Sequence, residues 1–185
     1  MRRELRQQRA ALSPAARRRA AESAAAQIAR TRLWRQIRHV AIYLEHGSEL
    51  ATAPLLRRAW RDGKRTYVPR IGRDRRMHFV EIRRDTPLRP NLYGIREPAH
   101  RHPLRPLRSL DLLLIPLVGF DARGYRLGTG GGYYDRALAH RMSHRPLCLG
   151  WAYSFQQVDA VPHDPWDQRL HGAVTEKGVL RWRTG

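Results

Sequence analysis

The sequence predicts a protein of the α/β class, in which strands and helices alternate along the chain. Its 185 residues suit a single domain over residues 1–185, long enough to bury about two thirds of the surface of the unfolded chain. Short apolar runs typical of strands are separated by longer runs typical of helices. The apolar run at 112–115 leads into a stretch dense in glycine and then into a helix start.

The N-terminal segment is strongly basic. Residues 1–9 have the pattern of a basic amphipathic turn of helix with Arg2 and Arg6 on one face, although a solvated, frayed terminus fits the same residues. The Ser-Pro pair at 13–14 is a helix-start signal, with serine as the N-cap and proline in the first turn. We expect the helix that begins there to run to residue 30.

The rest of the chain continues the alternation. We expect strands at residues 39–44, 65–70, 77–82, 147–152 and 172–176, and helices at 52–62 and 133–142. Cys148, the single cysteine, lies in one of these strands, so we expect it to be buried rather than nucleophilic. One cysteine excludes an internal disulfide and a cysteine-rich zinc site.

The stretch from 119 to 135 has the composition of an anion-binding loop. Its glycines let the backbone approach a ligand closely, and loop amides that lead into a helix N-terminus point partial positive charge at an anion. Arg126 precedes Gly128 by two residues and can neutralise phosphate oxygens, while Asp135 follows Gly132 by three and can hold magnesium. The stretch lacks the Gly-Lys-Ser/Thr ending of a P-loop and the dinucleotide fingerprint, so a flexible surface loop stays open as the alternative.

Further acidic residues are candidates for a site. Glu49 lies beyond the end of the first predicted strand, where a substrate can be met, but an acid there also suits the entry to the following helix. His163, Asp164 and Asp167 lie in a cluster whose composition is that of a metal site and equally that of a structural turn. The residues alone leave both questions open.

The charge balance indicates an anionic partner. The net charge of +20 arises from 36 basic and 16 acidic residues, and just two of the basic residues are lysines, Lys64 and Lys177. The arginines are dispersed and lack the aromatic interleaving of RNA-binding segments, so we expect small polyanions such as ATP or a polyglutamylated cofactor rather than nucleic acid. No apolar stretch approaches the roughly 20 residues of a membrane span, and no signal peptide is recognisable, so we expect no membrane partner and a cytoplasmic location.

The glycine-rich stretch resembles the signature of a known enzyme family. The residues that carry the resemblance are Pro116, Phe120, Asp121, Gly124, Arg126, Leu127, Gly128, Gly130, Gly132, Tyr133, Tyr134, Asp135 and Arg136. They are similar to the signature of the 5-formyltetrahydrofolate cyclo-ligases, also called methenyltetrahydrofolate synthetases. Flanking segments follow in the family's order, with Glu-x-x-Thr at 49–52, Tyr-Gly-Ile-x-Glu-Pro at 93–98 and Val-Thr-Glu at 174–176. The resemblance extends from Arg2 to about Gly178.

The resemblance implies a fold and a reaction. The fold is a three-layer α/β/α domain of Rossmann-like type with a mostly parallel sheet. The reaction is the ATP- and Mg-dependent cyclisation of 5-formyltetrahydrofolate to 5,10-methenyltetrahydrofolate, with ADP and phosphate released, through a formyl group phosphorylated to an imidate phosphate. We expect ATP and a reduced folate, with or without a polyglutamyl tail, as partners, Mg²⁺ as cofactor, and a monomer.

Family positions carried onto this chain give a predicted set of site residues. For ATP they are Arg2, Arg6, Arg126, Gly128, Thr129, Gly130, Gly131, Gly132, Tyr133, Tyr134 and Asp135. For the folate they are Leu44, Glu49, Tyr93, Gly132, Tyr133 and Tyr134, with Leu44 and Tyr93 expected against the pterin ring. Arg126, Tyr133 and Tyr134 are expected to be catalytic, and Asp135 and Asp167 to hold magnesium. Tyrosine in a helix start is as often a packing residue, and His171 replaces an acidic residue of the family, so it is assigned no role.

Overall fold

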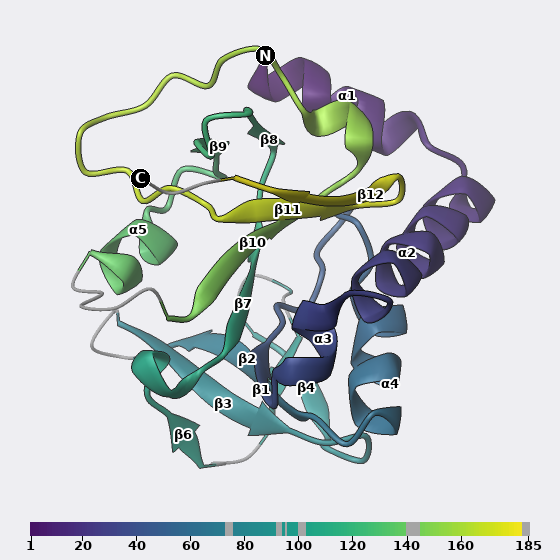
Figure 1. Cartoon of the computed structure of the whole chain (residues 1–185), viewed down its shortest axis with the longest axis vertical. Coiled ribbons are helices and arrows are strands. Elements are labelled where there is room, and N and C mark those ends of the chain that lie inside the picture. The colour runs from purple at the N-terminus through teal and green to yellow at the C-terminus, as the bar shows by residue number, and fades with distance from the viewer. Residues whose placement is uncertain (73–75, 92–93, 95, 100–102, 140–144, 183–185) are drawn as a thin grey trace.

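The computed structural model describes residues 1–72, 76–91, 94, 96–99, 103–139 and 145–182 (Figure 1). Its helices are α1 (Arg2–Ala11), α2 (Pro14–Ala29), α3 (Arg32–Gln36), α4 (Ala53–Arg61) and α5 (Tyr133–Leu138). The main sheet comprises β1 (His39–Ala41), β2 (Arg65–Ile71), β3 (Met77–Ile82), β6 (Leu104–Arg105), β7 (Leu112–Pro116), β10 (Leu147–Trp151), β11 (Gly172–Thr175) and β12 (Gly178–Arg181). Two hairpins pair β4 (Leu88–Pro90) with β5 (Arg96–Pro98) and β8 (Gly119–Phe120) with β9 (Arg126–Leu127). Within the described part of the chain, no helix combines the length and the apolar composition that a membrane span requires.

Five parallel strands form the centre of the sheet. The strand order is β12-β11-β10-β7-β1-β2-β3-β6, with parallel pairing from β11 to β2 and antiparallel pairing at β12, β3 and β6. The sheet is therefore mostly parallel, as predicted. The chain moves outward from β1 in two directions, first to β2 on one side and later to β7 on the other. Ligands of open α/β sheets bind beyond the carboxyl ends of the strands at such a reversal.

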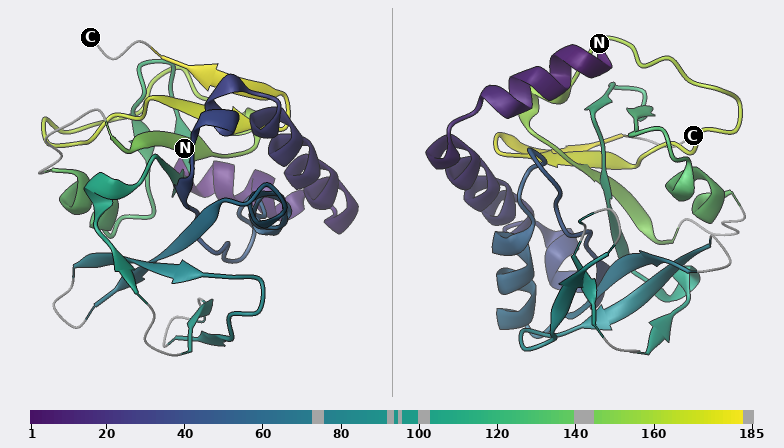
Figure 2. Two further views of the ribbon diagram at one scale, coloured as in Figure 1. Left: turned by 60° about the horizontal axis from the view of Figure 1, so that its bottom comes forward. Right: turned by 180° about the vertical axis from the view of Figure 1, so that it is seen from behind.

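Alternate residues of the central strands point into two separate cores. Leu112 and Leu114 of β7 pack in the core that includes α2, α3 and α4, whereas Leu113 and Ile115 pack with Leu138 of α5 on the other side. Figures 1 and 2 show α2 and α4 close together on one side of the sheet, with α5 apart from them. The α/β class and its layers are confirmed, and the second helical layer is one short helix completed by loops.

α1 packs over the β8–β9 hairpin. Leu5 is buried in a small core with Val118 and Leu127, and the buried Arg9 donates its Nη1 to Leu117 O at 3.3 Å. The basic N-terminal segment is therefore a helix of ten residues anchored by its apolar face. The alternative of a frayed terminus is wrong.

Some element boundaries differ from the prediction. β1 ends at Ala41 rather than at residue 44. Ile42 N still donates to Tyr67 O of β2 at 2.8 Å, but Tyr43 O and Glu45 Oε2 lie 2.9 and 2.6 Å from the Thr52 hydroxyl, so the chain there bonds to the start of α4. α5 ends at Leu138, and residues 140–142 of the predicted helix lie outside the described part of the chain. The β8–β9 hairpin interrupts the stretch that was predicted as one loop, and α3, β4, β5, β6 and β12 were not predicted.

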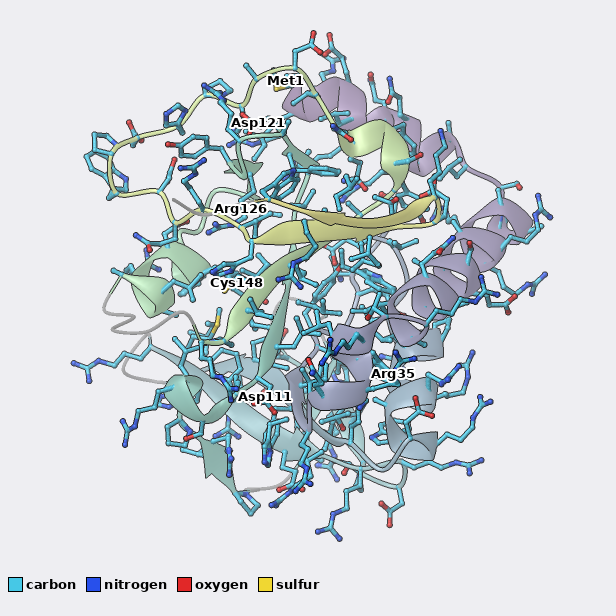
Figure 3. The ribbon with its side chains drawn as sticks, in the orientation of Figure 1. Met1, Arg35, Asp111, Asp121, Arg126 and Cys148 are labelled. Carbon is cyan, nitrogen blue, oxygen red and sulfur yellow. The ribbon has the colours of Figure 1, made fainter. Side chains whose placement is uncertain are left out.

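The amino end of β7 is fixed to β1 by hydrogen bonds, and the predicted site residues lie toward its carboxyl end. At its amino end the Asp111 carboxylate accepts hydrogen bonds from the amides of Arg38 and His39 at 2.9 Å each, which ties β7 to the start of β1. Cys148 on the neighbouring β10 is fully buried, as expected. Figure 3 shows Asp111 far from Arg126, which lies toward the other end of the sheet. The predicted site residues therefore lie at the edge of the sheet where the parallel strands have their carboxyl ends.

Candidate active site

Two cavities lie beyond the carboxyl ends of β1 and β7. The first, which we call the glycine-loop cavity, has a volume of about 320 Å³ and is lined by Arg2, Pro116, Arg126, Leu127, Gly128, Thr129, Gly130, Gly131, Gly132, Tyr133, Tyr134, Asp135, Pro162, Asp164 and Asp167. The second, which we call the strand-end cavity, has a volume of about 360 Å³ and is lined by Tyr43, Leu44, His46, Glu49, Pro69, Arg70, Ile71, Met77, Asn91, Arg96, Glu97, Pro116, Thr129 and Tyr134. The two cavities share three lining residues, Pro116, Thr129 and Tyr134, which form a wall between them.

The backbone of the glycine-rich stretch is built to turn around the first cavity. Gly130 has φ +106° and Gly132 has φ +60°, a region that residues with a side chain adopt at a cost. Gly132 is the N-cap of α5, so the following amides begin a helix without an internal acceptor. Among the described residues, none accepts a hydrogen bond from the amides of Thr129 to Tyr134. A ligand with several anionic oxygens suits this row of donors.

Arg126 and Asp135 form an ion pair inside the glycine-loop cavity. The Nη2 of Arg126 lies 2.6 Å from Asp135 Oδ1, and the side chains are 6% and 27% exposed. Arg126 also donates to Gln168 O, and Asp135 accepts from Gln168 N at 3.1 Å. The pair therefore connects the hairpin, the start of α5 and the loop before β11. Both residues lie where the sequence predicted, and each already has a partner.

Two predicted metal ligands line the same cavity. Asp135 and Asp167 both contribute to its wall, and the Asp167 carboxylate accepts from Asp164 N at 2.9 Å. In the described ranges no group of three or more His, Cys, Asp or Glu side chains could hold a metal ion. The two carboxylates of Asp135 and Asp167 suit Mg²⁺ rather than an ion that is coordinated by protein groups alone. Mg²⁺ is commonly held by one or two carboxylates together with the phosphates of its ligand.

The structure separates the two predicted N-terminal arginines. Arg2 donates its Nε to Gly128 O at 3.1 Å and lines the glycine-loop cavity. Arg6 is exposed one turn further along α1, where it borders a shallow surface depression with Arg2 and Arg3. Arg6 therefore shares this depression with Arg2 but does not line the glycine-loop cavity.

Glu49 and Tyr134, which are distant in the sequence, both line the strand-end cavity. Burial raises the pKa of Glu49, against the hydrogen bond from His46 N and the charge of Arg9, which lower it. Burial first, and the nearby Glu49 carboxylate second, also raise the pKa of Tyr134 well above its usual range, and the same two causes act on Tyr43. Both tyrosines therefore keep their protons at neutral pH. The Tyr43 hydroxyl donates to Trp151 O at 3.5 Å, whereas the Tyr134 hydroxyl can donate to a ligand.

The structure locates some of the residues that the resemblance predicts for folate binding. Leu44 and Glu49 line the strand-end cavity, whereas Tyr93 lies outside the described residues. Glu97 and Arg70 also line this cavity and were not predicted as site residues. Glu97 was within a segment already recognised as family-like, but Arg70 lies at the end of a strand whose sequence, RTYVPR, reveals nothing beyond strand propensity.

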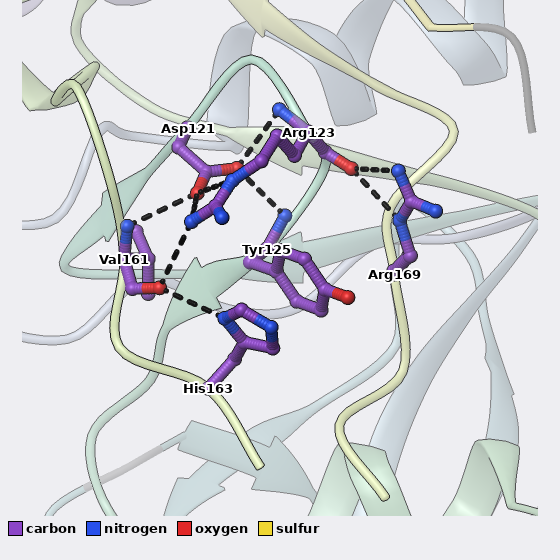
Figure 4. Close-up of polar contacts among 6 residues, drawn as sticks. All are labelled: Asp121, Arg123, Tyr125, Val161, His163 and Arg169. Atoms are coloured by element: carbon purple, nitrogen blue, oxygen red, sulfur yellow. Dashed lines mark hydrogen bonds and ion pairs between the residues drawn. The ribbon is translucent and has the colours of Figure 1, made fainter. Parts of the chain in front are cut away.

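Asp121 anchors the loop that closes the glycine-loop cavity (Figure 4). Its fully buried carboxylate accepts hydrogen bonds from the amides of Arg123, Tyr125 and Val161, and pairs with the Arg123 guanidinium at 2.8 Å. Burial alone would raise the pKa of Asp121, but these hydrogen bonds hold it below its usual value. The Arg169 guanidinium donates to Arg123 O at 2.6 and 2.8 Å. Both ends of the segment that carries Asp164 and Asp167 are thereby fixed to the hairpin.

The chain matches known proteins along most of its length. The sequence profile of the 5-formyltetrahydrofolate cyclo-ligase family matches residues 1–176. The chain is 37% identical over 139 residues to the 5-formyltetrahydrofolate cyclo-ligase of Haemophilus influenzae, covering 74% of each chain. It is 37% identical over 146 residues to that of Escherichia coli K12, covering 77% of this chain and 80% of the relative.

Two solved structures share the fold. The NMR structure of Aquifex aeolicus 5,10-methenyltetrahydrofolate synthetase matches with a TM-score of 0.86 and 31% identity, over 100% of this chain and 92% of that one. The 5,10-methenyltetrahydrofolate synthetase of Mycoplasma pneumoniae matches with a TM-score of 0.75 and 26% identity, over 95% and 96% of the chains. The fold and these likenesses define an α/β enzyme of the ligase class. The chain belongs to the 5-formyltetrahydrofolate cyclo-ligase family.

Proposed function

We propose that the chain catalyses the ATP- and Mg-dependent cyclisation of 5-formyltetrahydrofolate to 5,10-methenyltetrahydrofolate, with release of ADP and phosphate. The observation that carries this proposal is the pair of cavities with a common wall. One is lined by a row of backbone amides and two arginines, which suits phosphates, and the other by apolar side chains and carboxylates, which suits a pterin. A phosphoryl group can pass between two such ligands only where they meet, at Pro116, Thr129 and Tyr134.

The chemistry needs positioning more than acid or base catalysis. The formyl group on N5 is amide-like, so its oxygen is a poor leaving group at neutral pH. Transfer of the γ-phosphoryl group of ATP to this oxygen gives ADP and an imidate phosphate. N10 then attacks the activated carbon and gives its proton to solvent, and the bond from carbon to the phosphorylated oxygen breaks as phosphate leaves with the electron pair. Alignment and charge neutralisation supply most of the rate in such transfers.

In the glycine-loop cavity, different groups bind the phosphates and the magnesium ion. Arg2 and Arg126 neutralise phosphate oxygens, and the amides from Gly128 to Gly132 cradle them. Bound Mg²⁺ would neutralise further charge on the phosphates, with Asp135 and Asp167 as its protein ligands. Arg6, outside the cavity wall, contributes attraction for the nucleotide at the surface.

The folate half uses the shared wall. Leu44 packs on the pterin ring, and Glu49 accepts hydrogen bonds from its N–H groups. Tyr134, which keeps its proton, donates to the formyl oxygen or to the phosphate that replaces it, and Tyr133 lines the phosphate side. Tyr93 is expected to stack on the folate, as the family resemblance implies.

The test is the appearance of the methenyl chromophore. Purified protein is given 5-formyltetrahydrofolate with ATP and magnesium, and each of the latter two is omitted in turn while absorbance is followed. We expect absorbance to rise only when both are present. Binding of ATP and folate without any rise would instead identify a non-catalytic regulator, and binding of neither would refute the assignment of both cavities.

A further inference from the structure

The strand-end cavity is lined by two arginines that a pterin ring cannot pair with, because it has no anionic group. Arg70 is half-buried at the carboxyl end of β2, and Arg96 is exposed on β5 of the neighbouring hairpin. They come from segments separated in the chain and meet at one cavity. A pterin presents hydrogen-bond donors and a flat apolar ring, which Glu49, Glu97 and Leu44 satisfy, and it presents no carboxylate.

Both guanidiniums keep their donors available. Among the residues that the structure describes, no carboxylate pairs with Arg70 or Arg96, and neither side chain donates a hydrogen bond. Arginines elsewhere in the same sheet behave differently, since Arg65 makes a two-pronged contact with Glu81 at 2.7 and 3.1 Å. The cavity therefore holds two planar cations with no internal anion assigned to them.

We infer that Arg70 and Arg96 bind the carboxylates of the glutamyl tail of the reduced folate, so that they set the enzyme's preference for glutamylated substrate. The inference rests on the proposed function. Each glutamyl unit presents carboxylates, and arginine forks match carboxylates through two parallel hydrogen bonds. The folate then lies with its pterin beside Glu49 and the shared wall and with its tail toward the β4–β5 hairpin.

The inference is tested by equilibrium binding without ATP, measured by calorimetry with two ligands. The first is 5-formyltetrahydrofolate, and the second is the matching pteroate, which ends at the benzoate and lacks glutamate. The variants are Arg70→Gln, Arg96→Gln and the double variant. The control is Arg89→Gln, which removes the same charge from the same hairpin at an exposed position that does not line the cavity.

The expected result is selective. Each cavity variant should bind the glutamate-bearing ligand about tenfold more weakly or worse, bind the pteroate as wild type does, and keep the wild-type melting temperature, while Arg89→Gln should change neither affinity. Further glutamates on the ligand should tighten wild-type binding and leave the double variant unaffected. Equal loss for both ligands, or no loss for either, overturns the inference while leaving the proposed function in place. If the wild-type protein binds neither ligand, the proposed function fails, and the inference fails with it.

Discussion

At the scale of single residues, Arg126 and Asp135 act as one unit. The guanidinium is nearly buried and is neutralised by a carboxylate that itself faces the glycine-loop cavity. In the proposed complex, a phosphate at Arg126 would share the guanidinium with Asp135, and Mg²⁺ held by Asp135 would leave that guanidinium to the phosphate. The two ligands together would keep the charges balanced, which a phosphate alone would not.

Replacing Arg126 should weaken the binding of ATP. Arg126→Ala should lose about 1.5–3 kcal/mol of ATP binding, because a charge-assisted contact to phosphate is removed. Calorimetric titration with ATP and magnesium measures the loss. Arg3→Ala is the control, since it removes an equal charge from α1 outside the cavity. Unchanged ATP affinity in Arg126→Ala would remove this arginine from the phosphate site.

Replacing Glu49 should stabilise the empty protein while harming its ligand site. Because burial raises the pKa of Glu49, the folded protein bears a cost for its charge above that pKa, whereas the unfolded chain does not. Below the unfolded pKa of about 4.3 both states hold the neutral acid and the cost disappears. Glu49→Gln should therefore melt at a higher temperature than wild type at pH 7 and at the same temperature near pH 4.

The same variant should bind folate more weakly with little change for ATP. Calorimetry with each ligand alone measures both effects. Equal weakening toward ATP and folate would contradict a dedicated folate contact, and a lower melting temperature at pH 7 would contradict the cost assigned to burial.

At the scale of elements, the glycine-rich stretch is a hairpin followed by a strained turn. Gly128 and Gly130 both have open space around the position of a Cβ, but Gly130 alone of the two has a positive φ. Gly130→Ala should therefore cost about 1–2 kcal/mol of unfolding free energy, and Gly128→Ala should cost much less. Urea unfolding of the two variants gives the comparison. Equal losses would show that φ at residue 130 is not what requires glycine.

The buried carboxylate of Asp121 fixes the start of the loop of residues 161–170. Asp121→Asn puts an amide where three backbone N–H groups and Arg123 need an acceptor, so it should cost about 2–4 kcal/mol at pH 7. Since the pKa of Asp121 is lowered in the folded state, the wild-type advantage should be lost as pH falls below the unfolded value of about 3.9 and through the folded one. Urea unfolding at several pH values measures this. A difference independent of pH would show that charge is not involved.

Elements with strong local signals were predicted, and those made by tertiary contacts were not. The Ser-Pro start of α2 and the alternation of β3 are local, and both elements were found within one residue of the predicted bounds. β12 and the β8–β9 hairpin exist because of pairing partners and had no comparable signal. In the site, the glycine-rich stretch was recognised because its residues are contiguous, whereas Arg70 and Arg96 were missed because only the fold brings them together. The exposed position of Arg6 likewise depends on the orientation of α1.

At the scale of the whole molecule, self-repulsion opposes the fold. With 36 basic and 16 acidic residues, basic side chains outnumber acidic ones by 20, and Figure 3 shows many side chains that end in nitrogen around the outline of the molecule. Raising NaCl from about 20 to about 300 mM shortens the Debye length from ~20 to ~6 Å. The melting temperature should therefore rise by several degrees, which a thermal scan at each salt concentration measures. A flat or falling trend would show that the charges are well compensated in the folded state.

The wall shared by the two cavities should couple the affinities of the ligands that bind in them. If nucleotide and folate occupy the two cavities as proposed, a ligand on either side contacts Pro116, Thr129 and Tyr134, and we expect the other ligand to meet a wall that is already ordered. Reciprocity then requires that folate tighten ATP by the same factor by which ATP tightens folate. A protein arranged in this way holds nucleotide loosely when substrate is scarce. We expect this linkage to limit idle hydrolysis of ATP, and equal ATP affinity with and without folate would contradict it.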